Sequence, residues 1–221
     1  MTLFPFFRNI EGAYGIITGG GKHALEKIEK LMPYGPQLYI FSEEFCEAIM
    51  QMLQQEYVSG RDCADKREER SVHLIDRKLQ EQDLEKVPAF VIAAGDDEQE
   101  NHQIAEWCRK RRIPVNVVDD QDYCDFIFPS LIARGNLSIG ICTNGASPAS
   151  GVLLKKRIEE QIPVHMEEIL DFLQEKRPVI RQSFPDKKKR FAFYHQLSKL
   201  CMEQDRILSE EEFFELTARY Q

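Results

Sequence analysis

The 221-residue sequence lacks the long apolar runs of membrane-spanning proteins. No stretch approaches the roughly 20 apolar residues that a transmembrane helix needs. Residues Met1 to Arg8 have neither the basic end nor the apolar core of a secretion signal. A hydrophobic fraction of 43% and a charged fraction of 30% are typical of a soluble globular protein. We therefore expect a cytoplasmic protein.

The sequence also lacks the cysteine spacing of a metal knot or a disulfide framework. There is no C-x-x-C pair, and no histidine lies at a zinc-like distance from a cysteine. The six cysteines are Cys46, Cys63, Cys108, Cys124, Cys142 and Cys201. We expect buried free thiols and no metal centre.

Positive charge is scarce as well. The 29 lysines and arginines are outnumbered by 37 aspartates and glutamates, which gives a formal net charge of −8. Nucleic-acid surfaces need clustered positive charge. We therefore expect a small-molecule ligand and no nucleic-acid partner.

A glycine-rich turn follows the first apolar segment of the chain. Gly15 to Thr18 reads as a short buried strand, and the apolar residues after the turn recur at helical spacing. Gly19, Gly21 and Ala24 occupy the three small-residue positions of the dinucleotide fingerprint. The first amides of the helix then point at whatever the turn holds. The stretch predicts a nucleotide-phosphate site, although such turns also occur for structural reasons alone.

Apolar segments and helical patterns alternate over residues 1–118. Five strands are expected, at residues 13–18, 38–41, 72–75, 89–94 and 115–118. Ser42 is expected to cap the second helix, and Asp96 or Asp97 the next one. The alternation predicts an α/β fold, a Rossmann-like doubly wound parallel sheet with right-handed crossovers.

Two stretches of this region have structural interpretations only. The apolar residues 1–9 are expected to pack along the first strand. The charge run at residues 60–70 is expected to be a solvated loop.

Ligands of doubly wound sheets bind beyond the carboxyl ends of the strands. Glycine-rich and polar residues follow four of the expected strands, at Gly19–Lys22, Ser42, Gly95 and Asp119. We therefore expect these residues to meet at one edge of the sheet.

The pattern changes after residue 118. Two apolar runs, 126–132 and 137–142, predict a hairpin. Helices are expected at residues 149–161, 164–176 and 186–205, with a last one after Ser209. Ser147 and Pro148 are suited to start the first of these helices, and Ser209 with Glu212 forms a capping box for the last. The expected regions are 1–118, a central hairpin region at 119–146 and a helical region at 147–221.

Six motifs carry a resemblance that is far more specific than the glycine turn. They are F-P-F-F at 4–7, G-G-G at 19–21, A-A-G-D-D at 93–97, N-V-V-D at 116–119, C-D-F-I-F-P at 124–129 and G-A-S-P at 145–148. Up to about Gln161 the chain resembles the precorrin-2 dehydrogenase family, small enzymes and fused siroheme-synthase domains that oxidise precorrin-2 to sirohydrochlorin. The resemblance implies NAD as hydride acceptor, a homodimer built through the central strands, and a helical part that helps to cover the tetrapyrrole. Some members also insert ferrous iron.

The resemblance assigns the principal catalytic role to Asp119. A carboxylate just past a parallel strand can take the proton that hydride removal leaves on the macrocycle, an effect worth about 10² to 10⁴ in rate. Asp120 and Asp122 lie beside it and are expected to raise its pKa by like-charge repulsion.

Other positions are assigned to the substrate. Thr143 aligns with a serine on the rim of the family's substrate cleft, and Asn144 replaces the usual glycine, which left-handed backbone at asparagine allows. Precorrin-2 is a polycarboxylate, so a net-negative protein must gather positive charge locally. Arg134 and the basic residues 155–157 are the candidates.

The cofactor pocket lacks one common feature. Many NAD sites hold the adenosine ribose with an acid at the end of the second strand, where this chain has Phe41 and Ser42. Contacts from Ser42 or Glu43 are expected instead, and the choice of NAD over NADP has little support. Lys22 and His23 follow the glycines and are placed either to flank the pyrophosphate or to reach the substrate, and His23 is equally compatible with a solvent-facing position on the helix. The remaining cofactor candidates are Gly19, Gly20, Gly21 and Gly95.

Two other functions are compatible with the sequence. A sirohydrochlorin ferrochelatase would use the nucleotide fold as a scaffold and needs no protein metal site, because the substrate's own nitrogens can hold iron. An NAD-sensing domain would bind the cofactor without chemistry, and it would have no use for Asp119 beside the C-D-F-I-F-P motif.

Overall fold

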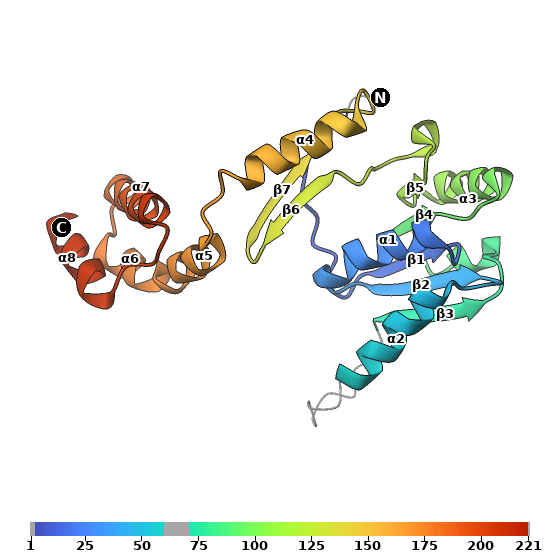
Figure 1. The fold of residues 1–221 in the computed structure, drawn as a ribbon, viewed down its shortest axis with the longest axis horizontal. Helices are drawn as coiled ribbons and strands as arrows, with labels where there is room; N and C mark the ends of the chain where they lie inside the picture. Colours follow the sequence, from blue (N-terminus) through green and yellow to red (C-terminus); the bar gives the residue numbers. More distant parts are fainter. Residues whose placement is uncertain (1–2, 60–70, 221) are drawn as a thin grey trace. The chain divides into compact units, whose positions relative to one another are not determined.

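The computed structural model describes residues 3–59 and 71–220 (Figure 1). The chain divides into two compact units, Met1–Ile127 and Phe128–Gln221. The charge run expected as a loop at residues 60–70 lies outside the described residues. Within the described ranges, no helix is long and apolar enough to cross a membrane.

The first unit is built on a five-stranded parallel sheet with the order β3-β2-β1-β4-β5. Its strands are β1 (Tyr14–Thr18), β2 (Gln37–Ser42), β3 (Val72–Asp76), β4 (Phe90–Ala93) and β5 (Val115–Val117). In the central strand, Ile16 lies opposite Tyr39 of β2 and Val91 of β4. The prediction of five strands and a doubly wound parallel sheet is confirmed.

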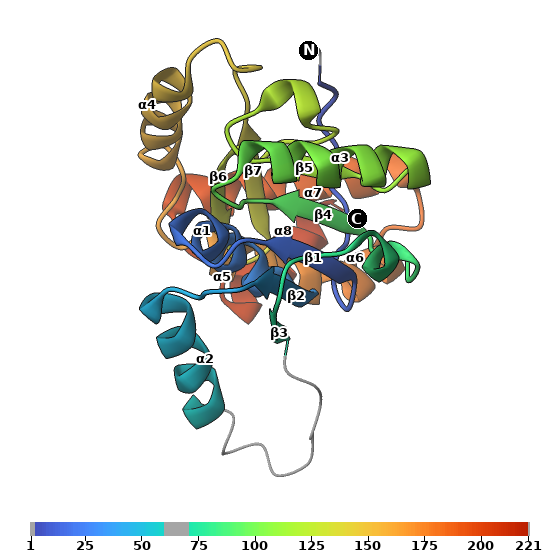
Figure 2. The same ribbon diagram turned by 90° about the vertical axis from the view of Figure 1, so that its right-hand side faces the viewer.

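Helices cover both faces of this sheet. They are α1 (Lys22–Leu31), α2 (Glu47–Ser59) and α3 (Glu98–Arg111). The strand order runs outward from β1 in one direction and from β4 in the other, so right-handed crossovers place α1 and α2 on one face and α3 on the opposite face. Figure 2 shows α3 running alongside β4, and its Ile104 and Cys108 share a core with Ile16 and Val91.

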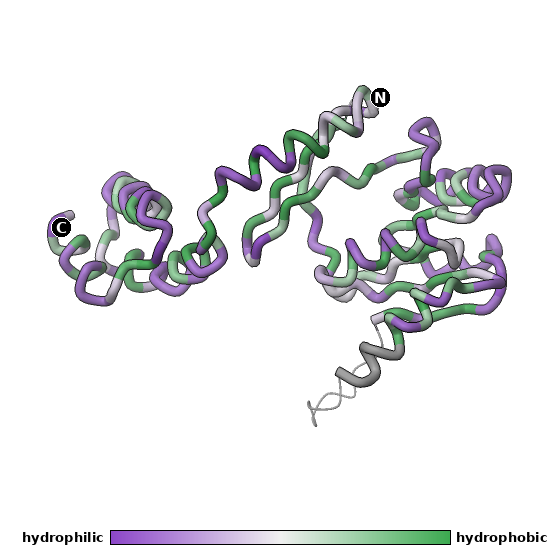
Figure 3. Tube along the Cα trace, viewed as in Figure 1, coloured by the Kyte–Doolittle hydropathy of each residue, from purple (hydrophilic) through white to green (hydrophobic). Residues whose placement is uncertain are grey.

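The inner strands are hydrophobic because both of their faces are covered. Every residue of the inner strand β4 is buried, and so is every residue of the edge strand β5. Figure 3 shows hydrophobic residues concentrated in the strands and hydrophilic ones recurring along α3. This is the expected pattern for a parallel sheet enclosed by helices.

The segment between β2 and α2 differs from the prediction. α2 begins at Glu47, so the expectation that Ser42 caps this helix is wrong. Ser42 Oγ instead donates to the Glu44 carbonyl at 2.6 Å. The Cys46 amide donates to the Gly20 carbonyl at 2.8 Å, and this contact with the glycine turn holds the segment outside the helix.

The prediction that residues 1–9 pack along the first strand is also wrong for the described part of that segment. Phe4, Phe6 and Phe7 are 84%, 75% and 77% exposed. Both edges of β1 are occupied by β2 and β4, which leaves no edge for this segment.

The second unit begins with the predicted hairpin. β6 (Ser130–Arg134) and β7 (Leu137–Ile141) are antiparallel, with Ile132 opposite Ile139. Gly135 in the turn has a φ of 50°, a backbone region that glycine adopts without a steric cost. The first strand begins later than its apolar run because Pro129 has no amide to donate to a ladder.

The remainder of the second unit is helical. Its helices are α4 (Pro148–Glu159), α5 (Met166–Glu175), α6 (Arg177–Ser183), α7 (Lys187–Gln204) and α8 (Glu210–Tyr220). Ser147 caps α4 by accepting from the Ser150 amide, as predicted. The helix α6 was not predicted, and Pro178 lies in its first turn, where proline starts a helix instead of ending one. Aromatic rings fill the core of the helices, with Phe184 stacked on Phe193.

The capping box of α8 is confirmed. It makes the stability of the second unit depend on pH in the acid range. Glu212 accepts two hydrogen bonds from Arg206, at 2.7 and 2.8 Å, and one from the Ser209 amide at 2.8 Å. The Arg206 guanidinium, with the Ser209 amide, lowers the pKa of Glu212 from 4.5 to about 2. A carboxyl whose pKa is depressed by folding stabilises the fold above its unfolded pKa, and the contribution is lost as the pH falls through the folded pKa.

We expect the Glu212→Gln variant to lose this part of the pH dependence. Thermal unfolding followed by circular dichroism should show the wild-type midpoint falling between pH 4.5 and about 2 more steeply than that of the variant. Glu211→Gln, a neighbouring change on the same helix turn, is the control and should keep the wild-type slope. Equal slopes for wild type and Glu212→Gln would contradict the prediction.

Candidate functional site

The glycine turn connects β1 to α1 in a conformation that larger residues resist. Gly19 has a φ of 93°, and a Cβ there would overlap the Ala94 carbonyl. Its amide donates to the Phe41 carbonyl at 2.9 Å. The turn is thus held against the carboxyl ends of both neighbouring strands, β2 and β4.

The next two glycines have different steric surroundings. A Cβ on Gly20 would overlap the Glu44 carbonyl, so this position is closed by protein. A Cβ on Gly21 would meet nothing within 4 Å, so this position faces open space. Gly21 is also the N-cap of α1 and supplies no side-chain cap for the first amides of the helix. An open helix N-terminus of this kind suits the phosphates of a dinucleotide.

Beside the turn, the buried hydroxyl of Thr18 has no hydrogen-bond partner within the described part of the chain. Lys22 and His23 are exposed in the first turn of α1, Ser42 is the last residue of β2, and Glu43 follows it. These residues lie at the carboxyl edge of the sheet, beside an open space and an uncapped helix. The residues present therefore fit a bound dinucleotide.

The loop after β4 is held by an interaction that sequence reasoning did not identify. Asn101 is buried, its Nδ2 donates to the Gly95 carbonyl at 2.8 Å, and its Oδ1 accepts from the Gly95 amide at 3.2 Å. Asp97 caps α3 by accepting from two amides, which confirms its predicted structural role. Both contacts fix Gly95 next to the glycine turn.

Asp119 follows β5 with strained backbone. Its φ is 62°, in the left-handed region that residues other than glycine rarely adopt. The loop is anchored to the sheet because the Val118 amide donates to the Ala93 carbonyl at 2.9 Å. Strained residues of this kind cluster at functional sites.

Lys27 is a site residue that sequence reasoning missed. Burial lowers the pKa of this lysine on α1, and the nearby negative charge of Asp119 opposes that shift. The two side chains are therefore within electrostatic reach, although they are far apart in the sequence. Helix α1, which starts at the glycine turn, thus also carries a charge that acts on Asp119.

Cys124 contacts β5, the strand that precedes the Asp119 loop. Its sulfur lies 3.2 Å from the Val117 nitrogen and 3.3 Å from Asn116 Nδ2. Burial raises the pKa of this thiol, which keeps it protonated and suits it to a structural role. The five described cysteines are free. The expectation that the free thiols are buried holds for Cys108, Cys124 and Cys201 but is wrong for Cys142, which is exposed, and for Cys46, which is half-buried. Cys63 lies outside the described residues.

The predicted substrate residues Arg134, Thr143 and Asn144 belong to the second unit. Asn144 has a φ of 49°, so asparagine does take the left-handed conformation in place of glycine. Thr143 Oγ1 accepts from the Ser147 amide at 3.3 Å, and Arg134 donates to the Pro163 carbonyl at 3.4 Å. Of the neighbouring basic residues, Lys155 forms an ion pair with Glu159 at 3.8 Å.

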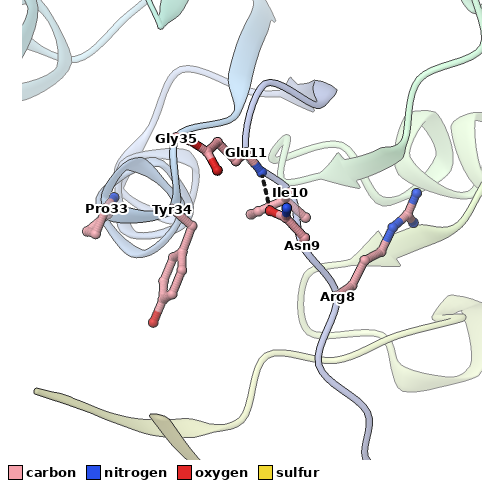
Figure 4. Close-up of a pocket in the computed structure, with 7 residues that line it drawn as sticks. All are labelled: Arg8, Asn9, Ile10, Glu11, Pro33, Tyr34 and Gly35. Atoms are coloured by element: carbon pink, nitrogen blue, oxygen red, sulfur yellow. Dashed lines mark hydrogen bonds between the residues drawn. The ribbon is translucent and has the colours of Figure 1, made fainter. Parts of the chain in front are cut away.

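A hollow in the first unit lies away from these residues. Figure 4 shows it between the segment before β1, including Arg8 and Glu11, and the turn after α1, including Tyr34. This is the amino edge of the parallel sheet, opposite the edge where its ligands bind.

The architecture and the site define an α/β dinucleotide-binding protein. Residues 6–130 match the family described as "Putative NAD(P)-binding". Because this match covers more than half of the chain, the protein belongs to this NAD(P)-binding family. Residues 134–161 match a second family, "Sirohaem biosynthesis protein central".

The curated relatives of the chain are siroheme synthases. The chain is 30% identical over 197 residues to the siroheme synthase of Thioalkalivibrio sulfidiphilus, covering 89% of this chain and 37% of the relative. It is 31% identical over 185 residues to that of Psychrobacter, covering 84% and 35%. The chain thus spans little more than a third of the length of these relatives.

A solved structure confirms the fold over the whole chain. The structure named SirC, precorrin-2 dehydrogenase, has a TM-score of 0.69, covering 99% of this chain and 98% of that one, at 19% identity. The Rossmann-like sheet, the small antiparallel sheet and the carboxyl-terminal helices are therefore a shared architecture.

Proposed function

We propose that this protein oxidises precorrin-2 to sirohydrochlorin with NAD as the hydride acceptor, in siroheme biosynthesis. The observation that carries the proposal is the placement of a strained acid, Asp119, and a glycine turn at the same edge of one parallel sheet. The siroheme-synthase relatives and the shared fold with a precorrin-2 dehydrogenase support the choice of substrate.

The glycine turn would hold the cofactor. Gly19 and Gly20 keep the turn close to the sheet, and Gly21 leaves the room that a pyrophosphate needs. Lys22, His23, Ser42, Glu43 and Gly95 complete the proposed pocket. When bound, the nicotinamide supplies a hydride acceptor. NAD is proposed over NADP because the resemblance to the precorrin-2 dehydrogenase family implies it.

Asp119 would act as the general base. Hydride loss from a bridging methylene carbon leaves a proton on the macrocycle, and a carboxylate within hydrogen-bond reach removes it. Asp119 is exposed at the sheet edge, where its oxygens are accessible to a ligand.

The second unit would supply substrate contacts. Arg134 and the basic residues of α4, Lys155 to Arg157, are proposed to face the substrate carboxylates, and Thr143 and Asn144 to hydrogen-bond the macrocycle. We also propose a homodimer built through the β6–β7 hairpin. Its support is the apolar side chains beside the hairpin, because Val152 and Leu153 of α4 are 61% and 64% exposed.

An anaerobic assay tests the proposed function. We expect precorrin-2 to yield sirohydrochlorin only when a nicotinamide cofactor is present, with the highest rate in NAD. The product is detected by absorption spectroscopy. NADP at the same concentration should support a lower rate. Siroheme formed from sirohydrochlorin and ferrous iron would indicate a ferrochelatase. Cofactor binding with no product would contradict the proposal and indicate a sensor.

A further inference from the structure

Three metal-ligating side chains converge at the start of α3. Glu98 and His102 are four residues apart and share one helix face, and Asp120 approaches from the loop after β5. His102 Nε2 lies 2.7 Å from Asp120 Oδ2 and 3.9 Å from Glu98 Oε1. One ligand atom from each residue lies within 4.8 Å of the other two.

Neighbouring groups orient two of these ligands. The His102 ring stacks on Tyr123 with centroids 3.9 Å apart and planes 8° from parallel. Arg109 lies over the same tyrosine ring, 4.8 Å from its centroid. Asp120 Oδ1 accepts from the Asp122 amide at 3.1 Å, which leaves Oδ2 to face the histidine. Such outer contacts fix the ring and carboxylate orientations that metal sites need.

The third ligand is the movable one. The Glu98 side chain is 82% exposed, whereas those of His102 and Asp120 are 26% and 28% exposed. A pre-oriented pair with one mobile carboxylate can close on an ion that arrives from solvent. Three protein ligands also leave coordination positions for water.

We propose that Glu98, His102 and Asp120 form a binding site for one divalent first-row transition-metal ion. One imidazole nitrogen with two carboxylate oxygens suits ions such as Fe²⁺, Co²⁺, Mn²⁺ and Zn²⁺. Binding replaces the hydrogen bond between His102 Nε2 and Asp120 Oδ2, because the ion takes its place between these two atoms. None of these three residues is proposed to contact the cofactor or the substrate in the dehydrogenation, and metal binding is measured without either, so the two proposals can fail separately.

Cobalt titration of the metal-free full-length chain, without an affinity tag, tests this site. Visible absorption and calorimetry should show one Co²⁺ ion per chain in the absence of NAD and tetrapyrrole. We expect His102→Gln and Glu98→Gln to weaken this binding by about tenfold or more. His165→Gln is the matched control, because His165 also lies beside a glutamate, with Nδ1 at 3.2 Å from Glu168 Oε1. It should leave the affinity unchanged.

A second measurement distinguishes a loss of metal binding from misfolding of a variant. Binding to the native state should raise the thermal midpoint of the wild type in Co²⁺ but not that of Glu98→Gln, whose exposed side chain is not needed for folding. Absence of binding at millimolar Co²⁺, or binding that all three variants retain at full strength, would overturn the proposal.

Discussion

Asp119→Asn is expected to lower precorrin-2 turnover by about 10² to 10⁴, the usual contribution of a positioned general base. Cofactor affinity should stay at the wild-type value, because the change adds no atoms near the glycine turn. Asparagine is the informative replacement, since it tolerates the left-handed backbone that Asp119 adopts, with a φ of 62°. Alanine would add backbone strain to the loss of the carboxylate. Single-turnover absorption measures the rate of turnover. Titration with NAD, followed by protein fluorescence, measures the cofactor affinity.

Asp122→Asn is the matched control for this experiment. Asp122 is an exposed aspartate in the same loop, and its removal changes the net charge by the same amount. Turnover should fall far less than in Asp119→Asn, because Asp122 is expected to act only on the pKa of Asp119 and not on the substrate itself. Equal losses in both variants would show that the loop needs negative charge in general. Wild-type turnover in Asp119→Asn would remove Asp119 from the proposed role.

Alanine substitutions at Gly20 and Gly21 are expected to separate folding from cofactor binding. At Gly21 the added methyl meets no protein atom within 4 Å, so the free energy of unfolding should not change. The same methyl occupies the space proposed for the pyrophosphate, and overpacking of about 1–3 kcal/mol corresponds to a roughly 5- to 150-fold loss of NAD affinity.

Gly20→Ala, in contrast to Gly21→Ala, should lower the free energy of unfolding. Its methyl would overlap the Glu44 carbonyl, and a backbone atom cannot rotate away as a flexible side chain can. We expect a loss of about 1–3 kcal/mol in denaturant unfolding. Unchanged NAD affinity in a folded Gly21→Ala variant would contradict the placement of the phosphates, whatever the result at Gly20.

Much of the fold follows from local patterns in the sequence. Each strand of the parallel sheet is a short apolar run, and burial on both faces makes such runs recognisable without a structure. The caps at Asp97, Ser147 and Ser209 were predictable for a similar reason, because a cap and its amides lie within three residues of each other. The turn at Gly135 was predictable for the same reason, because it also depends on residues that are adjacent in the sequence.

The errors occurred where distant contacts overrule local preference. Ser42 has the chemistry of a helix cap, but the Cys46 amide bonds to Gly20 and the helix starts later. The short helix α6 has Pro178 in its first turn, and a proline at that point of the sequence is equally compatible with the end of the helix before it.

The sequence by itself determined the parallel sheet, the glycine turn, the hairpin and the helical tail, because each depends on residues close together in the chain. Tertiary structure alone decided which side chains meet. Lys27 of α1 lies within electrostatic reach of Asp119 in the loop after β5, and His102 contacts Asp120, which is 18 residues away in the sequence. Such pairs arise only when crossovers bring separate elements to one edge of the sheet. A local sequence pattern does not encode how close two side chains on different elements lie in space.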